Sequence, residues 1–327
     1  MELSNQSGGG VTKLPPVWVR LLPYFLSAVL FLSGFFAILA PLPLLILAMG
    51  GAESSVGMGR PSKGRWLTLM FAVLTNSVIM WSVGGPDILV AYTFLTTLLV
   101  FLTLFVNDRV QRSVWSVEKT FVWIWGGVLA AALLIVLVFS IRAGLAPWAW
   151  VKQGVRVHLE VFLAGVTPEA KTQLLGELEF DDFLGRFMQE LPGSFMVMTF
   201  AWVFVNWTTL LRMNVGDIRT RLGLNADFFK GWKAPETLVW PTLAAGALIV
   251  FGRGNWAMVG MNAFKVLMAV YAVQGLSILS AIFDLWKLKG GLRSVGFVLV
   301  FLLMSPLLLS LGFFDTWFDF RAKFRQA

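Results

Sequence analysis

The polar residues of one long apolar stretch, Trp256–Trp286, are the clearest candidates for chemistry in this sequence. At 100° per residue of an α-helix, they fall on or beside one line along the helix: Asn262, Lys265, Ser277, Ser280 and Asp284. Ionisable groups inside a membrane are costly, so each is a functional hypothesis by default. One interpretation is the wall of a small-solute cavity in which Lys265 meets an anion. The other is hydrogen bonding between helices, with Lys265 paired to a carboxylate or extended toward the surface.

The C-terminal residues form the densest group of charged and aromatic side chains. Asp315 and Asp319 are one helical turn apart, and Asp319 is placed to pair with Lys323. A pair of carboxylates can bind a cation or carry protons, but the neighbouring basic residues favour a charge-paired anchor at the membrane interface. The predicted anchor, or partner contact, comprises Asp315, Trp317, Asp319 and Arg321.

The side chains that most often carry catalysis or bind metals are scarce. The sequence has no Cys, and His158 is its only histidine, which excludes thiolate metal sites and Ser-His-Asp triads. It also has no GxxxxGK[ST] loop for ATP. We therefore predict that the chain is not an enzyme and holds no metal or cofactor.

Long apolar stretches must position all these residues. Phe195–Leu211 and Val295–Phe313 are typical, and each approaches the ~20 residues needed to cross ~30 Å of hydrocarbon. Hydrophobic residues make up 57% of the chain and charged residues only 13%. The sequence predicts an all-α fold, a polytopic transmembrane helix bundle of about 8–9 spans with an amphipathic helical outer segment and a C-terminal interfacial helix.

We expect a flexible polar tail over residues 1–16 and a single helical membrane domain over residues 17–327. Within that domain, residues 143–193 differ in kind, because seven acidic residues outnumber four basic ones. Their apolar residues recur at helical spacing, and Thr167-Pro168-Glu169 has the layout of a helix start. This pattern predicts one or two amphipathic helices in an extramembrane insertion.

Two further patterns concern the packing of the spans. Thr237–Phe251 and Trp256–Trp286 are expected to form a hairpin that turns at residues 252–254. On one face of Phe195–Leu211 lies a second polar set, which we interpret as hydrogen bonding between helices rather than a site. It consists of Thr199, Asn206 and Thr209.

The formal net charge of +8 comes from Lys and Arg residues in the connectors between apolar stretches. This placement is typical of the positive-inside rule, and no basic stripe with interleaved aromatics indicates nucleic-acid binding. With the basic connectors inside, the N-terminus is cytoplasmic and residues 143–193 lie outside. The pattern leaves open whether residues 44–59 span or re-enter the membrane, and on which side the tail lies.

Three pieces of the C-terminal third resemble, in order, the YybS-like family of predicted bacterial membrane proteins. They are Ala234–Trp240, Tyr271–Leu276 and Leu311–Arg321. The early Pro41-Leu42-Pro43 also fits the family. The resemblance implies the bacterial cytoplasmic membrane and a fold similar to the substrate-binding subunits of energy-coupling-factor vitamin transporters, but it brings no catalytic residues.

Two functions are predicted from these features. The first is a transport-related protein that binds a small solute within its helix bundle, alone or with other membrane subunits or an ATPase module. The alternative is a membrane scaffold or assembly partner of an envelope complex, with residues 143–193 and the basic connector Arg212–Lys233 as docking surfaces. In both cases the lipid bilayer is the first partner.

Overall fold

The computed structural model describes short stretches between Leu22 and Gly50, residues 116–214, Arg219, Leu224, Asn225, and residues 227–303 and 305–326. Every regular element in these ranges is a helix, which confirms the predicted all-α class. The chain divides into two compact units, residues 1–100 and 101–327. The predicted tail over residues 1–16 and the apolar stretches between residues 51 and 115 lie outside the described ranges.

The first unit contains helix α2, Leu42–Gly50. Pro43 lies in its first turn, where a proline is tolerated because first-turn amides have no partner within the helix. Leu44 and Leu45 are buried, and the hydroxyl of Ser27 donates a hydrogen bond of 2.6 Å to the carbonyl of Ala40. The predicted alternative of a span or a re-entrant segment over residues 44–59 lies partly outside the described residues.

The second unit begins with the long apolar helix α5, Val117–Arg142. The Ser116 hydroxyl caps it by accepting a hydrogen bond of 3.2 Å from the amide of Lys119. Its outer face carries large exposed apolar side chains, as expected of a surface that meets lipid. They include Val122, Trp123, Leu133, Leu134, Leu137 and Ile141.

The predicted outer segment forms two short helices and the beginning of a third. They are α6, Pro147–Ala164, α7, Pro168–Leu175, and α8, Phe180–Met213. The predicted start at Thr167 is confirmed, because its hydroxyl accepts a hydrogen bond of 3.3 Å from the amide of Ala170. The predicted span Phe195–Leu211 is the second half of α8, so the helix continues through Gly193.

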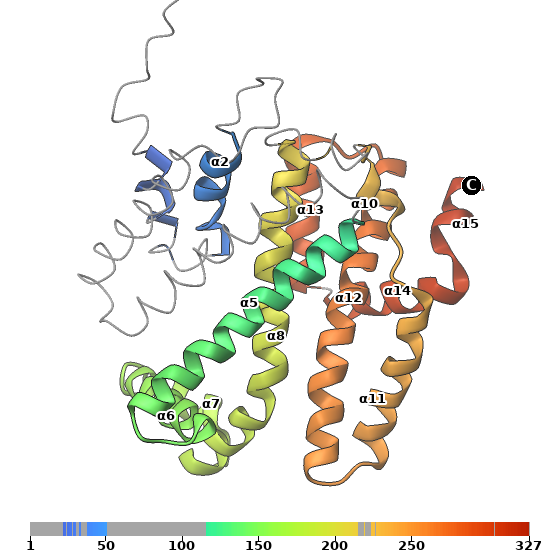
Figure 1. Ribbon diagram of the computed structural model, residues 1–327. Helices are drawn as coiled ribbons and strands as arrows, with labels where there is room; N and C mark the ends of the chain where they lie inside the picture. Colours follow the sequence, from blue (N-terminus) through green and yellow to red (C-terminus); the bar gives the residue numbers. More distant parts are fainter. Residues whose placement is uncertain are drawn as a thin grey trace, which may run out of the picture. The chain divides into compact units, whose positions relative to one another are not determined.

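The predicted hairpin is confirmed (Figure 1). Helix α11, Val239–Phe251, follows the 3₁₀ helix η3, Glu236–Leu238, and pairs with α12, Asn255–Leu285. Gly254 takes a φ of 55° in the turn, a backbone conformation that is unfavourable for residues with a Cβ atom. Upstream of η3, the short helix α10, Phe228–Gly231, leads into non-helical backbone from Trp232 to Pro235.

The last predicted span, Val295–Phe313, is wrong as a single helix. The structure divides it between α13, Gly290–Leu303, and α14, Ser305–Phe318. Pro306 lies in the first turn of α14, where its missing amide hydrogen breaks no helical bond; inside one long span it would break one. The predicted amphipathic tail helix also divides, because Asp319 takes a φ of 41° between α14 and α15, Phe320–Gln326.

Helix α12 is the centre of the second unit and packs against α8, α11 and α14. Two glycines allow its close approach to α14, because a Cβ on Gly275 would strike the backbone of Leu308. A Cβ on Gly312 would strike the carbonyl of Tyr271 and lie 2.9 Å from the amide nitrogen of Gly275. Leu279, Phe283 and Leu308 form the apolar core beside this crossing.

Three helices in the described ranges, α5, α8 and α12, are long and apolar enough to cross a membrane. Shorter apolar helices cover Glu236–Phe251, Gly290–Val300 and Pro306–Phe318. The predicted total of about 8–9 spans stays a prediction, since much of the first hundred residues is not described.

Candidate functional site

The first half of the α12 polar face is used to bind α8. The amide of Asn262 accepts a hydrogen bond of 2.6 Å from the Gly193 N–H and donates one of 2.8 Å to the Gln189 carbonyl. In a regular helix those two backbone groups are partners of each other, but Pro192 interrupts α8 at this point. The side-chain amide of Asn262 thus replaces the hydrogen bond that these two backbone groups would otherwise make with each other.

Lys265 is paired within the chain as well. Its ammonium group lies 3.0 Å from a carboxylate oxygen of Glu190 and 3.3 Å from the hydroxyl of Ser194, both on α8. Of the two interpretations of Lys265, the structure therefore supports pairing with a carboxylate between helices. An anion would have to displace Glu190 to reach it.

The second half of the polar face binds the segments that surround the end of α12. The Ser277 hydroxyl donates a hydrogen bond of 2.9 Å to the Lys230 carbonyl. Arg293 of α13 donates to the Ser280 hydroxyl at 2.7 Å and to the Asp284 carboxylate, which also pairs with Lys230 at 2.9 Å. Hydrogen bonds from Lys230 to Asp227 and Asp284 raise the pKa of the lysine and keep it charged.

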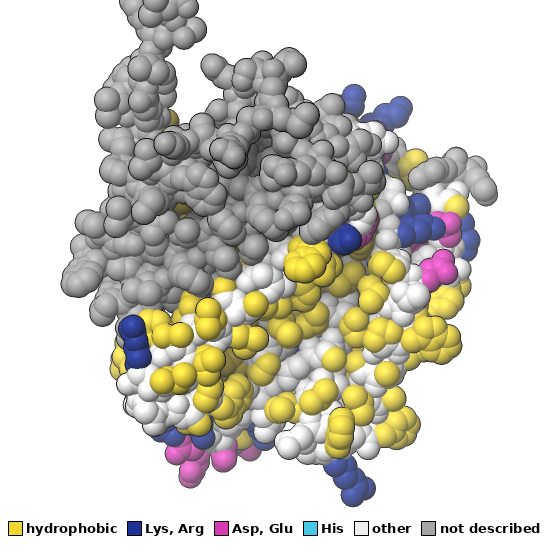
Figure 2. Space-filling model, in the orientation of Figure 1, with side chains coloured by type: hydrophobic (Ala, Val, Ile, Leu, Met, Phe, Trp, Pro, Cys, Tyr) yellow, Lys and Arg dark blue, Asp and Glu magenta, His cyan; other side chains and the backbone are white. Residues whose placement is uncertain are grey.

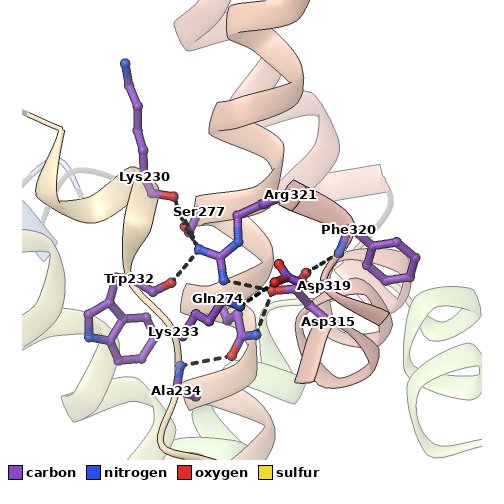
Figure 3. Close-up of polar contacts among 10 residues, drawn as sticks. All are labelled: Lys230, Trp232, Lys233, Ala234, Gln274, Ser277, Asp315, Asp319, Phe320 and Arg321. Carbon is purple, nitrogen blue, oxygen red and sulfur yellow. Dashed lines mark hydrogen bonds and ion pairs between the residues drawn. The ribbon is translucent and has the colours of Figure 1, made fainter. Parts of the chain in front are cut away.

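The most buried polar cluster centres on Arg321 and Asp315 (Figure 3). These side chains are only 3% and 1% exposed, and their ion pair is 2.8 Å long. The ion pair uses Nη2 of Arg321, and Nη1 donates to the Ser277 hydroxyl at 3.0 Å. Asp315 also accepts from the Gln274 amide at 2.9 Å and from the Phe320 N–H at 2.8 Å.

This Arg321 cluster holds the non-helical backbone that follows α10. Arg321 donates to the carbonyls of Trp232 at 2.8 Å and Lys230 at 3.3 Å, and Gln274 accepts from the Ala234 N–H at 3.0 Å. Such backbone needs partners inside a membrane protein, since it has no helical hydrogen bonds of its own. The cluster therefore fixes this segment to α12 (Figure 3).

Two residues of the predicted anchor, or partner contact, are paired inside the protein, and their role as an anchor stays a prediction. Asp315 and Arg321 are buried and form an ion pair with each other. Asp319 pairs with Lys233 at 3.0 Å instead of Lys323, and this contact lowers the pKa of the Asp319 carboxyl. Trp317 is 53% exposed, so an interfacial role for it stays a prediction.

Sequence reasoning gave Gln274 no role, although a signal was present. Ala234, Gln274 and the Asp315–Arg321 pair belong to the three separate pieces that carried the family resemblance. The structure brings these pieces together in one cluster. The three motifs could therefore have been expected to contact one another in the fold, although they were read as independent.

One member of the polar set on α8 hydrogen-bonds to another helix. Thr199 is buried and accepts from the indole N–H of Trp125 on α5 at 3.2 Å, as predicted. The Thr209 hydroxyl donates to the Val205 carbonyl at 2.7 Å, and the Asn206 amide donates to the Trp202 carbonyl at 2.8 Å. Those last two contacts lie within α8.

The outer segment presents its charge to the surroundings. All seven of its acidic residues are exposed: Glu160, Glu169, Glu177, Glu179, Asp181, Asp182 and Glu190. Arg156 pairs with Glu160 at 3.6 Å and with Asp181, and Lys265 pairs with Glu190. Among the described residues the other four carboxylates have no ion-pair partner; they lie on α7, in the α7–α8 connection and at the start of α8.

Figure 2 shows acidic side chains gathered at this end of the second unit, below a surface that is largely hydrophobic. Helix α7 buries none of its own residues, and the side chain of Leu174 is 48% exposed.

Across the described ranges no group of three or more His, Asp or Glu residues is placed to hold a metal ion.

Comparison with known protein families yields a match. A family model described as "Predicted membrane protein (DUF2232)", a family of unknown function, matches residues 19–316. The match confirms the expected kinship with an uncharacterised membrane family. No curated protein and no solved structure matches the chain.

Proposed function

Because the chain belongs to this family of predicted membrane proteins, we propose that it is an integral membrane protein that serves as a scaffold or assembly partner. Its docking surface is the acidic surface formed by α7, the connection to α8 and the first turn of α8, residues 167–182. The partner is a protein with a basic face.

Helix α7 is the observation that carries this proposal. It has 8 residues and a complete start, with Thr167 as cap and Pro168 in the first position, yet it buries no side chain. Isolated helices shorter than ~12–15 residues are marginal in water, because nucleation fixes several residues for one hydrogen bond. A helix this short is therefore better explained if another surface covers it.

Charge selects the kind of partner. Glu169, Glu177, Glu179 and Asp182 are exposed, and none has an ion-pair partner in the described part of the chain. Anionic lipid headgroups would repel these carboxylates, whereas a basic protein surface would attract them and speed association. The basic connector Arg212–Lys233 is a second candidate surface, but part of it lies outside the described residues.

A second candidate function is the transport-related binding of a small solute, and the Arg321 cluster favours it. A buried ion pair inside a membrane protein is a functional hypothesis by default. The Nε–H of Arg321 has no hydrogen-bond partner among the described residues, and two of its neighbours are backbone carbonyls. An anionic solute would be a stronger partner for the guanidinium than those carbonyls.

The solute hypothesis now has to place its site at Arg321, because Lys265 and the rest of the α12 polar face are bonded within the chain. It predicts that an organic carboxylate or phosphate raises the Tm of the protein but not that of an Arg321→Lys variant. Association with an ATPase module, the bacterial inner membrane as location and the absence of catalysis stay predictions.

The scaffold proposal is tested by neutralising the acidic surface. The variant carries Glu169→Gln, Glu177→Gln, Glu179→Gln and Asp182→Asn, and the control carries Glu236→Gln at an exposed position in η3. Each protein is extracted from native membranes in a mild detergent, and the mass of the recovered particle and its Tm are measured.

We expect the unmodified chain and the control to retain the same basic protein, and retention to weaken as salt increases. The neutralised variant should lose this protein while its Tm stays unchanged, because α7 makes no buried contact. Recovery of the unmodified chain alone, or equal retention by the neutralised variant, would overturn the proposal.

A further inference from the structure

We propose that the turn between α12 and α13, Leu285–Leu292, binds the headgroups of anionic glycerophospholipids. The inference does not depend on the scaffold proposal, because it concerns another surface and another kind of partner. It combines the position of the turn along α12, its free positive charge and its backbone conformation.

The length of α12 places the turn at the level of the headgroups. The helix has 31 residues, and at 1.5 Å per residue it is ~46 Å long. A bilayer measures about 40–45 Å when its headgroup regions are included. Trp256 and Trp286, at the two ends of the helix, are each 67% exposed, and tryptophan prefers the two membrane interfaces.

The turn also carries the chemistry that an anionic headgroup needs. Lys287 and Lys289 are exposed, and neither has an ion-pair partner among the described residues. The nearest carboxylate along the chain, Asp284, already pairs with Lys230 and Arg293 and does not compete for them. The two ammonium groups are therefore available to phosphate oxygens.

Apolar side chains of the same turn are placed to enter the lipid. Leu285 is 52% exposed and Leu292 is 65% exposed, on either side of the two lysines. With Trp286 they supply the apolar contact that accompanies charge at a membrane surface. Apolar area and positive charge together make lipid a better partner than a free phosphate ion.

The backbone at Lys287 indicates a function for this side chain. The Lys287 N–H donates to the Asp284 carbonyl at 3.0 Å, and the Leu288 N–H donates to the Phe283 carbonyl at 2.9 Å. This Schellman motif ends α12 and requires a left-handed residue, which is usually glycine. Lys287 fills the position with a φ of 55°, so a strained lysine stands where glycine would fit freely.

The test uses protein in nanodiscs of phosphatidylcholine, with or without an equal amount of phosphatidylglycerol. Lys287→Gly removes a charge and relieves the strained backbone, and Lys289→Gln removes the second charge. Arg253→Gln, in the turn at the opposite end of α12, is the matched control. Lipid binding is measured by native mass spectrometry, and Tm is measured in both kinds of disc.

We expect phosphatidylglycerol to raise the Tm of the unmodified chain and of Arg253→Gln. Each turn lysine removed should weaken phosphatidylglycerol binding about fivefold. Lys287→Gly should also have a higher Tm than the unmodified chain in phosphatidylcholine alone, which shows that the variant folds. Equal phosphatidylglycerol binding by the double variant, or an equal Tm increase from inorganic phosphate, would overturn the inference.

Discussion

Asn262 shows how a polar residue in an apolar helix can be structural. Its amide pairs with the two α8 backbone groups that flank Pro192. Replacing it with leucine leaves those groups without their partners, which costs about 1–3 kcal/mol. We therefore expect Asn262→Leu to lower the Tm of the protein in detergent.

Pro192→Ala provides the matched background for that measurement. Without the proline, α8 is able to straighten and pair the Gly193 N–H with the Gln189 carbonyl, so Asn262→Leu should cost less than in the unmodified chain. If the losses of stability from Asn262→Leu and Pro192→Ala simply add in the double variant, Asn262 does not compensate for Pro192.

The buried ion pair allows a second residue-scale prediction. Asp315→Leu or Arg321→Met alone leaves an uncompensated buried charge, which costs about 3–5 kcal/mol. The variant that carries both Asp315→Leu and Arg321→Met should lose less stability than the two single variants lose together. A thermal double-mutant cycle measures this coupling, and a coupling near zero would show that the pair is not as buried as described.

Lys233→Gln is the control for that cycle, because Lys233 and its partner Asp319 are half exposed. We expect little change in Tm. The small contribution of this pair is present at neutral pH and is lost as the pH falls through the lowered pKa of Asp319, since a protonated carboxyl no longer pairs.

At the residue scale, the sequence could indicate which side chains are polar on α12 but not what they contact. Lys265 and Glu190, or Gln274 and Ala234, are tens of residues apart. Helical spacing predicts neighbours on one helix only, and no rule of spacing predicts which distant segment packs against that face. For the same reason the spacing of the tail residues did not predict that Arg321 contacts the carbonyls of Lys230 and Trp232.

At the scale of helices, the close crossing of α12 and α14 gives the next prediction. Gly312→Ala should force the two helices apart, because its Cβ would strike the Tyr271 carbonyl. We expect a loss of ~1–3 kcal/mol, typical of overpacking. Gly246→Ala in α11 is the control, since nothing lies within 4 Å of the added methyl group and alanine favours a helix.

Thermal unfolding of both glycine variants checks the crossing. An equal Tm for Gly312→Ala and Gly246→Ala would mean that α12 and α14 do not approach as closely as described. A higher Tm for Gly246→Ala alone is also expected, because glycine has an unfavourable helix propensity and the added methyl group meets open space.

Helix ends were predicted correctly where they depend only on residues close together in the sequence. The Thr167 cap and the turn at residues 252–254 depend on neighbouring residues, and both are confirmed. The continuous α8 and the division between α13 and α14 were missed. Pro192 is tolerated through a contact with another helix, whereas Pro306 begins one, and composition alone does not distinguish the two cases.

At the scale of the molecule, the second unit is electrically polarised. Helices α6 and α7 and the α11–α12 turn lie at one end, and α10 lies at the other (Figure 1). The acidic surface, which includes α7, is at the first end. Lys230 lies on α10 and pairs with Asp284 near the end of α12, which Lys287 and Lys289 follow. The sidedness predicted from the basic connectors, which places the basic end inside, stays a prediction.

The absence of cysteine makes that sidedness measurable, because a single introduced cysteine is the only labelling site. We expect a membrane-impermeant maleimide to label Arg253→Cys in intact spheroplasts but Lys289→Cys only after the membrane is opened. The reverse pattern would invert the topology. Labelling of both positions in intact spheroplasts would place both turns of α12 outside.

Site-directed photo-crosslinking in native membranes shows whether α7 docks on another protein. A photoreactive amino acid replaces Leu174 on α7, or, as control, the exposed apolar Val250 on α11. We expect one discrete protein adduct from position 174, lost when the four unpaired carboxylates are neutralised, and none from position 250. No adduct from position 174, or the same adducts from both positions, would contradict it.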